Sequence, residues 1–299
     1  MRTLARIGLV LLVVALAATA AAAAGFLAWR GKLERNLARN SRIVATARGP
    51  IEMAEHGEGR PILVSHGTPG GYDATLNYLE ATGGGAGLRY ILPSRPGYLK
   101  TPLSVGRTPA EQAEAFAALL DRLGVERVAI LAVSGGGPAA LEFALAHPDR
   151  CSALILEEAV TVGQPATSSL PGDLIVWLER PLAAAGWRQQ SPDDPAVPAL
   201  SGAVMDALAP QALRAAGTAN DLDQLSRLRA LPLDRVSCPT LIIHGTADQA
   251  VPLASARQAH AMIAGSRLVE LQGADHMMVV TRRREIDAAI NEFLSQHPG

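Results

Sequence analysis

One serine in this chain has the surroundings expected of a catalytic nucleophile. Ser134 follows the apolar run VAILAV and opens the stretch SGGGPAA, in which three glycines precede a proline. Ala132 and Gly136 are small residues two positions to either side, which is the G-x-S-x-G pattern with alanine in the first place. The pattern predicts a strand, a tight turn and a helix, with the Ser134 hydroxyl presented at the turn. No lysine follows the glycines, which disfavours a phosphate-binding loop.

Hydrogen-bond donors for a developing oxyanion are expected beside this serine. The loop HGTPGG, residues 66–71, follows another apolar run and can turn a backbone N–H group back toward the end of that run. Thr68 is the natural donor in this loop, and the N–H group of Gly135 is the second. Two such donors would form the oxyanion hole that acyl transfer requires.

An acid and a base occur later, each in a loop that follows an apolar run. Asp248 lies in HGTADQAVP and His276 lies in GADHMM, so the chain order is serine, aspartate, histidine. This is one of the orders in which a serine–histidine–acid triad occurs. Glu157 and Glu158, at the end of an earlier run, are the alternative candidates for the acid.

Other polar residues in these loops are expected to be structural. His66 and His244 each precede a glycine after an apolar run, which favours a role in shaping loops. Asp275 is adjacent to His276 and is expected to be a turn residue. Arg95, in PSRPGY, either orients a substrate carboxylate or braces a loop, and the second reading is favoured.

The elements that must position these residues are six near-continuous apolar runs. Such runs are typical of strands that are buried on both faces, as in a parallel sheet. Between them lie helical patterns, of which the clearest has Thr108 as N-cap, Pro109 at the first helical position and Gly124 just past the end. Alternating strands and helices predict a three-layer α/β fold. The runs are PILVSHG (61–67), RYILPSR (89–95), VAILAVS (128–134), ALILEEA (153–159), TLIIHGT (240–246) and RLVELQG (267–273).

One segment interrupts this alternation. Residues 161–235 show short helical patterns with proline breaks and no clear strand. We expect this segment to be a helical lid, inserted into a core that consists of residues 43–160 and 236–299. The alternative is that its helices simply extend the core. Four lid residues are expected either to line an apolar substrate pocket or to pack the lid on the core: Leu174, Ile175, Val176 and Trp177.

Residues 1–42 have the composition of a membrane anchor or a signal segment. No charged residue lies between Arg6 and Arg30, and a helix from Ile7 to Trp29 would be about 34 Å long, against a hydrocarbon core of about 30 Å. This length favours an uncleaved anchor; a cleaved signal and a soluble helix are the alternatives. The heavier basic flank follows the span, which favours a cytoplasmic domain if the helix is kept. Cleavage of a signal would instead place the domain outside the cytoplasm, so the sequence does not decide on which side of the membrane the domain lies.

The composition excludes several other classes of function. The 27 basic and 28 acidic residues give a net charge of -1, so no nucleic-acid partner is expected. The sequence has no cluster of metal-ligand residues and no dinucleotide fingerprint, and no cofactor is expected. The two cysteines, Cys151 and Cys238, are too few for a disulfide scaffold and are expected to be small buried apolar residues.

These motifs together resemble the α/β-hydrolase family, in its lid-bearing branch of esterases, C–C bond hydrolases and proline-iminopeptidase-like enzymes. The resemblance covers roughly residues 45–296 and rests on HGTPGG, PSRPGY, AVSGGG, HGTADQAVP and GADH in the order of the family. The sequence departs from the family at Ala132, where a glycine is usual, and at Val133, where a histidine is usual. In the fold that the resemblance implies, Cys151 and Cys238 precede adjacent parallel strands and would pair if the domain is exported.

The resemblance implies a role for each site residue. Ser134 would attack a carbonyl carbon, His276 would take its proton, and Asp248 would hold the imidazole. Thr68 and Gly135 would bind the oxyanion through backbone N–H groups. The expected reaction is hydrolysis of a small-molecule carboxylic ester with a small or medium apolar acyl group. Residues expected to contact the substrate are Val133, Trp177 and Met277.

The same triad serves other chemistry, and two alternatives stay open. In the first alternative, the protein is an enzyme whose substrate is an N-terminal amide, a vinylogous diketone or a thioester. An aminopeptidase would use acidic lid residues to hold the substrate amine, for which Asp193, Asp194, Asp221 and Asp223 are available. In the last alternative the chain is a membrane-tethered binding protein without catalysis.

Overall fold

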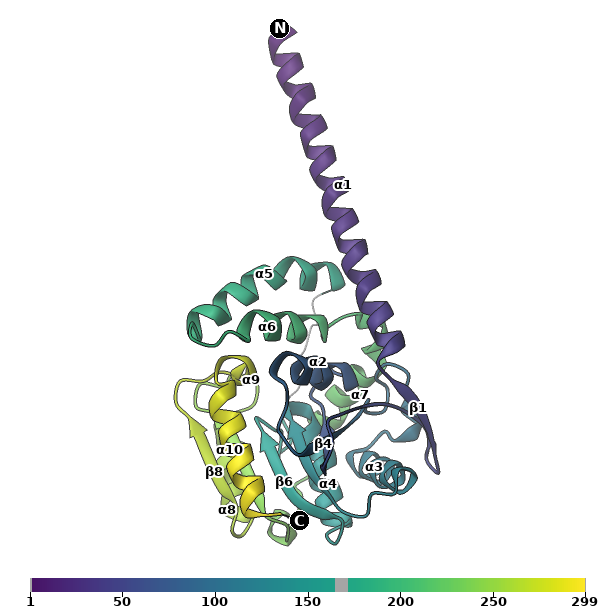
Figure 1. The fold of residues 1–299 in the computed structure, drawn as a ribbon, viewed down its shortest axis with the longest axis vertical. Helices are drawn as coiled ribbons and strands as arrows, with labels where there is room; N and C mark the ends of the chain where they lie inside the picture. Colours follow the sequence, from purple (N-terminus) through teal and green to yellow (C-terminus); the bar gives the residue numbers. More distant parts are fainter. Residues whose placement is uncertain (1, 165–171, 299) are drawn as a thin grey trace.

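The strands form one mixed sheet in the order β1-β2-β4-β3-β5-β6-β7-β8. The computed structural model of the chain describes residues 2–164 and 172–298 (Figure 1). The first two strands are antiparallel to their neighbours, and the remaining six are parallel to one another. The strands are β1 (Arg42–Thr46), β2 (Gly49–His56), β3 (Arg60–Ser65), β4 (Leu88–Pro93), β5 (Val128–Val133), β6 (Cys151–Glu157), β7 (Thr240–Gly245) and β8 (Arg267–Leu271).

The six apolar runs of the sequence become β3 to β8, as predicted. The central strands β6 and β7 are buried along their whole length, because helices cover both faces of the sheet there. The hairpin of β1 and β2 was not predicted. Only Val44 is buried in β1, because this strand lies at the edge of the sheet and has one side open to water.

Helices on both faces complete three layers. One core cluster joins the sheet to α3, α4 and α8, and a second cluster on the other face joins it to α2 and α10. The expected ends of α3 are confirmed: Thr108 and Glu111 form a capping box, and Gly124 has a φ of 66°. The helices outside the segment between β6 and β7 are α1 (Arg2–Arg39), α2 (Tyr72–Thr82), α3 (Pro109–Leu123), α4 (Gly137–Ala146), α8 (Leu253–Met262), α9 (Met278–Thr281) and α10 (Arg283–Gln296).

The segment between β6 and β7 is helical where it is described, and we call residues 172–235 the helical insertion. Its helices are α5 (Asp173–Gln190), α6 (Val197–Asp206) and α7 (Ala215–Ser226). A buried ion pair between Arg214 and Asp73, at 2.7 Å, attaches it to α2. Residues 165–171 of the lid predicted from the sequence lie outside the described residues.

The long N-terminal helix α1 projects from the body (Figure 1). The basic segment after the apolar run, which the sequence indicated as a polar juxtamembrane stretch, is also part of this helix. It packs on the body because Trp29, Leu33 and Leu37 share one buried helix face. The Tyr72 hydroxyl donates to the carbonyl oxygen of Leu37 at 3.0 Å. Among the described residues, α1 is the one helix long and apolar enough to cross a membrane.

The two cysteines lie together inside the core. Both are buried free thiols, Cys151 at the start of β6 and Cys238 just before β7. A hydrogen bond with Cys238, together with burial, raises the pKa of the Cys151 thiol. The pairing expected for an exported domain stays a prediction.

Candidate active site

Ser134 lies at the turn between β5 and α4, with the strained backbone that the sequence pattern predicts. Its φ is 47°, in the left-handed region that residues with a side chain seldom occupy. The following glycines leave no room for a side chain: a Cβ atom on Gly136 would overlap the Ser65 carbonyl oxygen, and one on Gly137 would overlap that of Val160. The backbone therefore lifts the Ser134 side chain above the end of the sheet.

The structure brings Ser134, His276 and Asp248 together from three separate strand ends. The Ser134 hydroxyl oxygen lies 3.0 Å from Nε2 of His276. The other ring nitrogen of His276, Nδ1, lies 2.8 Å from Oδ2 of Asp248. Because an ionised carboxylate only accepts hydrogen bonds, Nδ1 carries the proton and Nε2 is free to accept the proton of Ser134.

The surroundings of Asp248 keep its carboxyl group ionised. Its Oδ1 accepts hydrogen bonds from the backbone N–H groups of Ala250, at 2.8 Å, and Val251, at 2.9 Å. Burial alone would raise the pKa of Asp248, but the hydrogen bond from His276 and these two backbone bonds outweigh it, so the pKa lies below its ordinary value. A charged Asp248 can hold the imidazole in one orientation and stabilise its protonated form.

The loop with Thr68 approaches the serine turn from β3. A Cβ atom on Gly135 would lie 3.5 Å from the backbone nitrogen of Thr68, so the two predicted oxyanion donors are neighbours. A Cβ atom on Gly67 would lie 3.2 Å from the Cβ atom of Ser134. The glycines at both positions allow this close approach of two backbone segments.

Arg95 is buried under the loop that carries Thr68 and forms hydrogen bonds with it. Its guanidinium donates to the carbonyl oxygen of His66 at 2.8 Å and to the hydroxyl of Thr68 at 3.2 Å. The side chain is 1% exposed and pairs with Asp221 of α7 at 2.5 Å. The structure therefore supports the favoured reading of Arg95 as a brace for a loop.

Asp221 links the helical insertion to the loop, and the sequence alone did not predict this. Its carboxylate accepts hydrogen bonds from the Thr68 hydroxyl, from Arg95 and from the Tyr98 hydroxyl, the last at 2.6 Å. Burial lowers the pKa of Arg95, but the charge of Asp221 more than compensates and raises it. Asp221 thus acts on the loop, whereas the sequence had offered it as a partner for a substrate amine; its carboxylate is already occupied by Arg95 and two hydroxyl groups.

The two other loop histidines hold backbone groups. Nδ1 of His66 lies 2.8 Å from the carbonyl oxygen of Gly67, and its Nε2 accepts from the N–H group of Arg95 at 2.9 Å. His244 lies 2.9 Å from the carbonyl oxygen of Val251. Burial lowers the pKa of both side chains, which keeps them neutral. These contacts agree with the structural role expected for both.

The alternative acids are buried, and neither forms a hydrogen bond with His276. Glu157 and Glu158 follow one another at the end of β6, and each has one carboxyl oxygen without a hydrogen-bond partner among the described residues. Burial and the charge of Asp287 raise the pKa of Glu157 to about 8. Burial and the charges of Glu157 and Asp248 raise the pKa of Glu158 well above its ordinary value. Asp248, and neither glutamate, is the hydrogen-bond partner of His276.

Of the three residues expected to contact the substrate, two are adjacent in sequence to Ser134 or His276, and the third packs on α1. Val133 directly precedes Ser134 and is partly exposed, and Met277 directly follows His276 and packs near α6. Trp177 instead packs on α1, with its ring centroid 6.0 Å from that of Phe26. The apolar pocket wall expected from the insertion is also not formed by its neighbours: Val176 is buried with Trp29, while Leu174 and Ile175 face outward. An apolar pattern identifies a helix face, but not the partner that the face meets.

A hydroxyl, an imidazole and a carboxylate thus lie in series over an α/β sheet with a tight serine turn, an arrangement that is typical of serine hydrolases. The family model of the alpha/beta hydrolase family matches residues 62–289, and the chain belongs to this family.

Individual relatives cover most of the chain. It is 28% identical over 255 residues to the uncharacterized hydrolase YcgS of Bacillus subtilis, which covers 77% of this chain and 89% of that protein. An alpha/beta hydrolase fold protein from Nakamurella multipartita has a similar structure, with a TM-score of 0.73 and 35% identity over 84% of this chain and 98% of its own. A membrane phospholipase A described as a bacterial virulence factor matches 98% of both chains with a TM-score of 0.64; at 23% identity this likeness is one of fold.

Proposed function

We propose that this protein is a serine hydrolase that cleaves carboxylic esters of small or medium apolar acyl groups. The observation that carries the proposal is the unbroken series from the Ser134 hydroxyl through His276 to Asp248, at 3.0 and 2.8 Å. Family membership supports hydrolysis in general, and the choice of an ester is our own inference.

The proposed reaction has two halves. Ser134 Oγ attacks the ester carbonyl carbon while its proton passes to Nε2 of His276, and the N–H groups of Thr68 and Gly135 receive the negative charge on the carbonyl oxygen. His276 then gives that proton to the departing alkoxide, which leaves as an alcohol. A water molecule loses a proton to His276 and attacks the acyl group, and the acid is released with the proton returned to Ser134.

We further propose that α1 is kept and anchors the protein in a membrane, with the helical insertion as a lid over the site. The length of the apolar segment supports an anchor more than a signal, because the apolar part of a signal is usually about 7–15 residues long. The likeness of fold to a membrane phospholipase A extends over 98% of this chain and so includes α1. The contact of Asp221 with the loop of Thr68 supports the insertion as a lid.

Hydrolysis of p-nitrophenyl esters from acetate to laurate by the full chain in detergent tests the proposal. Turnover that is lost in Ser134→Ala, while the variant keeps the wild-type unfolding midpoint, is the expected result, and the optimum chain length measures the pocket. If no ester is turned over but a fluorophosphonate labels the wild type and not Ser134→Ala, the nucleophile stands and the substrate is an amide, a thioester or a C–C bond. Equal labelling of both proteins would refute the site.

A further inference from the structure

Helix α5 of the insertion presents an apolar face that no described part of the chain covers. Leu178 is 56% exposed and Leu182 is 73% exposed, and Leu174 and Ile175 are also exposed. At about 100° per residue these side chains fall within one stripe of the helix, and the fully buried Val176 lies on the opposite side. The stripe has no charged residue, although the charged Glu179 lies beside it. Such a face in water needs a partner.

This face lies at the end of the body from which α1 emerges. Phe26 and Trp177 are in ring contact, and Nε1 of Trp29 donates to Oδ1 of Asp206 on α6 at 2.9 Å. Arg30 lies 3.7 Å from Asp173, the first residue of α5. Figure 1 shows α5 as the part of the body nearest the free portion of α1, running crosswise to it. A membrane crossed by α1 would therefore have its surface along α5.

The length of the part of α1 that projects from the body also places the membrane surface at α5. Phe26 is where α1 first meets the body, and residues 7–26 would span about 30 Å, which is the thickness of a hydrocarbon core. Trp29 and Arg30 follow directly, and both residue types are typical of the membrane interface. With residues 7–26 in the hydrocarbon core, α5 lies at the height of the lipid headgroups.

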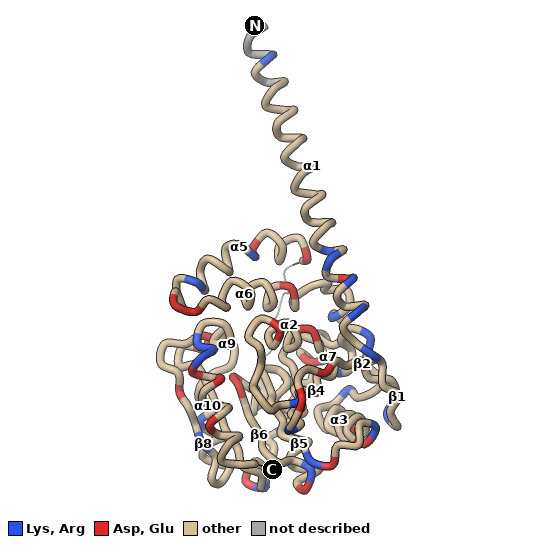
Figure 2. Tube along the Cα trace, viewed as in Figure 1, with Lys and Arg blue, Asp and Glu red and all other residues tan. Residues whose placement is uncertain are grey.

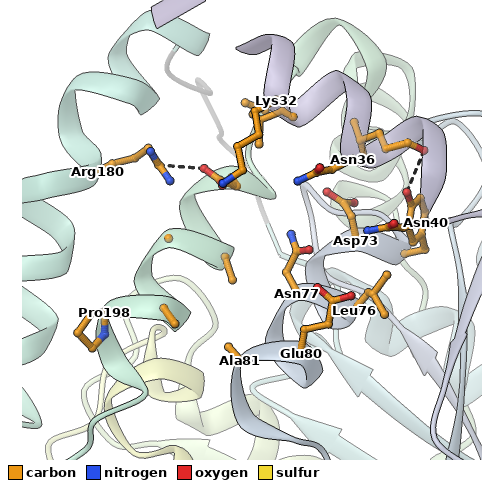
Figure 3. A pocket seen from close by; sticks show the side chains of 18 residues that line it. Lys32, Asn36, Asn40, Asp73, Leu76, Asn77, Glu80, Ala81, Arg180 and Pro198 are labelled. Atoms are coloured by element: carbon orange, nitrogen blue, oxygen red, sulfur yellow. Dashed lines mark hydrogen bonds and ion pairs between the residues drawn. The ribbon is translucent and has the colours of Figure 1, made fainter. Parts of the chain in front are cut away.

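The distribution of charged residues along α1 is the one expected at a membrane interface, with an uncharged stretch followed by basic residues. Figure 2 shows a long stretch of α1 without charge between the basic segment near its N-terminal end and the basic residues gathered where it meets the body, among them Arg30, Lys32, Arg35 and Arg39. A cavity of about 400 Å³ lies beside this basic stretch, between α1, α2, α5 and α6, and Lys32 is among the residues that line it (Figure 3). Asn36, Asn40 and Asn77 point into it. Helix α5 meets α1 earlier, where Trp177 contacts Phe26, at the boundary between the uncharged part of α1 and its basic stretch.

We propose that α5 lies in the interface of the membrane that α1 spans, with its Leu174–Leu182 face among the headgroups and first acyl carbons of a phospholipid bilayer. The active site would then take its substrate from that bilayer, so the substrate class is an ester carried by an amphipathic lipid. The substrate class rests on the proposed hydrolysis of esters, whereas the position of α5 rests only on the proposed anchor α1. An amphipathic helix binds an interface through its buried apolar area and through attraction of basic residues to anionic lipids.

A fluorescent label on α5 tests its position without reference to catalysis. Because Cys151 and Cys238 are buried, Leu178→Cys and Leu182→Cys each supply one accessible thiol for an environment-sensitive label. The control is Ile43→Cys, an exposed apolar position on β1 beyond the last turn of α1. The full-length proteins are placed in vesicles of phosphatidylcholine and phosphatidylglycerol that contain a lipid-borne quencher.

We expect the labels on α5 to be quenched at least about threefold more than the label at position 43, with emission shifted to the blue. Equal quenching at all three positions would overturn the proposal. So would a cross-link between two copies of Leu178→Cys without lipid quenching, because the face would then be covered by a second chain.

Kinetics of a double variant test the substrate class. Leu178→Asp/Leu182→Asp is compared with Glu179→Gln, an exposed change on the same helix, on a soluble p-nitrophenyl ester and on an ester-labelled phospholipid in vesicles. The double variant should keep the soluble activity within about twofold and lose at least about tenfold on the vesicle substrate, while Glu179→Gln keeps both. Equal losses on both substrates, or no loss on either, would refute the substrate class. If the wild type cleaves neither ester, the proposed function fails, and quenching still decides where α5 lies.

Discussion

Arg95 and Asp221 form an ion pair at 2.5 Å in which both side chains are almost completely buried, and the pair joins the helical insertion to the loop that carries Thr68. Removal of one partner of a buried ion pair is costly, because the other charge is then left without an opposite charge in a medium of low dielectric constant. The pair therefore couples the position of α7 to the geometry of the proposed oxyanion hole.

Removal of this pair should affect stability and turnover together. Asp221→Asn leaves the Arg95 charge buried and unpaired, and we expect a loss of about 3–5 kcal/mol in the free energy of unfolding. The remaining folded enzyme should show a reduced kcat, since asparagine has one acceptor oxygen in place of two, and the Thr68 hydroxyl then competes for it with Arg95 and the Tyr98 hydroxyl. Asp223→Asn on the same helix, which breaks the exposed pair with Arg227 and affects a hydrogen bond from Gln224, should cost under about 1 kcal/mol. Urea unfolding of both variants checks the difference, and equal losses would contradict it.

The two candidate acids can be separated by activity. Asp248→Asn removes the charge that orients His276, and kcat should fall by about 10⁴-fold, as expected when the imidazole takes the wrong tautomer. Glu158→Gln conserves the shape of a side chain that is not bonded to His276 and should change kcat by no more than about threefold. Initial rates on one ester, measured for both variants at matched folded fractions, decide the assignment. The reverse order of effects would favour Glu158.

Glu157 should make stability fall as the pH rises. Its pKa is raised from 4.5 to about 8 by burial and by Asp287, so between these values the folded chain holds a proton that the unfolded chain has released. The stabilisation is complete below about pH 4.5 and is lost as the pH passes through about 8. Glu157→Gln mimics the protonated form and should unfold with a shallower pH dependence.

Urea midpoints at several pH values between about 5 and 9 test this prediction. The gain of Glu157→Gln over the wild type should grow with pH, and a constant difference would contradict the prediction. Glu58→Gln, a change at an exposed position, serves as the control.

The serine turn should be intolerant of a methyl group, whereas another glycine should accept one. Gly136→Ala places a Cβ atom against the Ser65 carbonyl oxygen, and we expect about 1–3 kcal/mol of destabilisation and loss of activity as Ser134 is displaced. Gly186→Ala, within α5, meets no atom within 4 Å and should stabilise the chain by up to about 1 kcal/mol. Thermal unfolding of both variants provides the comparison, and similar shifts would refute the steric account.

The residues at strand ends could be predicted because each carries a local signal. Ser134 follows a buried run and precedes glycines, and Asp248 and His276 follow further runs in loops of typical composition. Parallel strands bring such loops to one edge of the sheet, so local pattern and topology together place the three residues. Their roles in catalysis stay predictions.

The contacts of the insertion could not be predicted in the same way. Asp221 meets Arg95 across 126 positions of sequence, and no local pattern distinguishes it from Asp223 on the same helix. Trp177 looked like a pocket residue because it is large and apolar, but its partner is Phe26, from a segment that sequence reasoning treated separately. The edge strand β1 escaped notice because its apolar run, residues 43–45, is only three residues long.

If α1 spans a membrane as proposed, its continuity determines how the body can search for a substrate. The helix runs without a break from Arg2 to Arg39, and its last turns are fixed to the body by Trp29, Leu33 and Leu37. A domain on a flexible linker samples a volume that grows with the length of the linker. Once α1 is inserted in a bilayer, this body has no such linker, so it diffuses laterally at constant height with one face toward the lipid. Its encounters with substrate would then depend on the number of molecules per unit area of membrane, and the concentration in the surrounding water would matter only through partitioning.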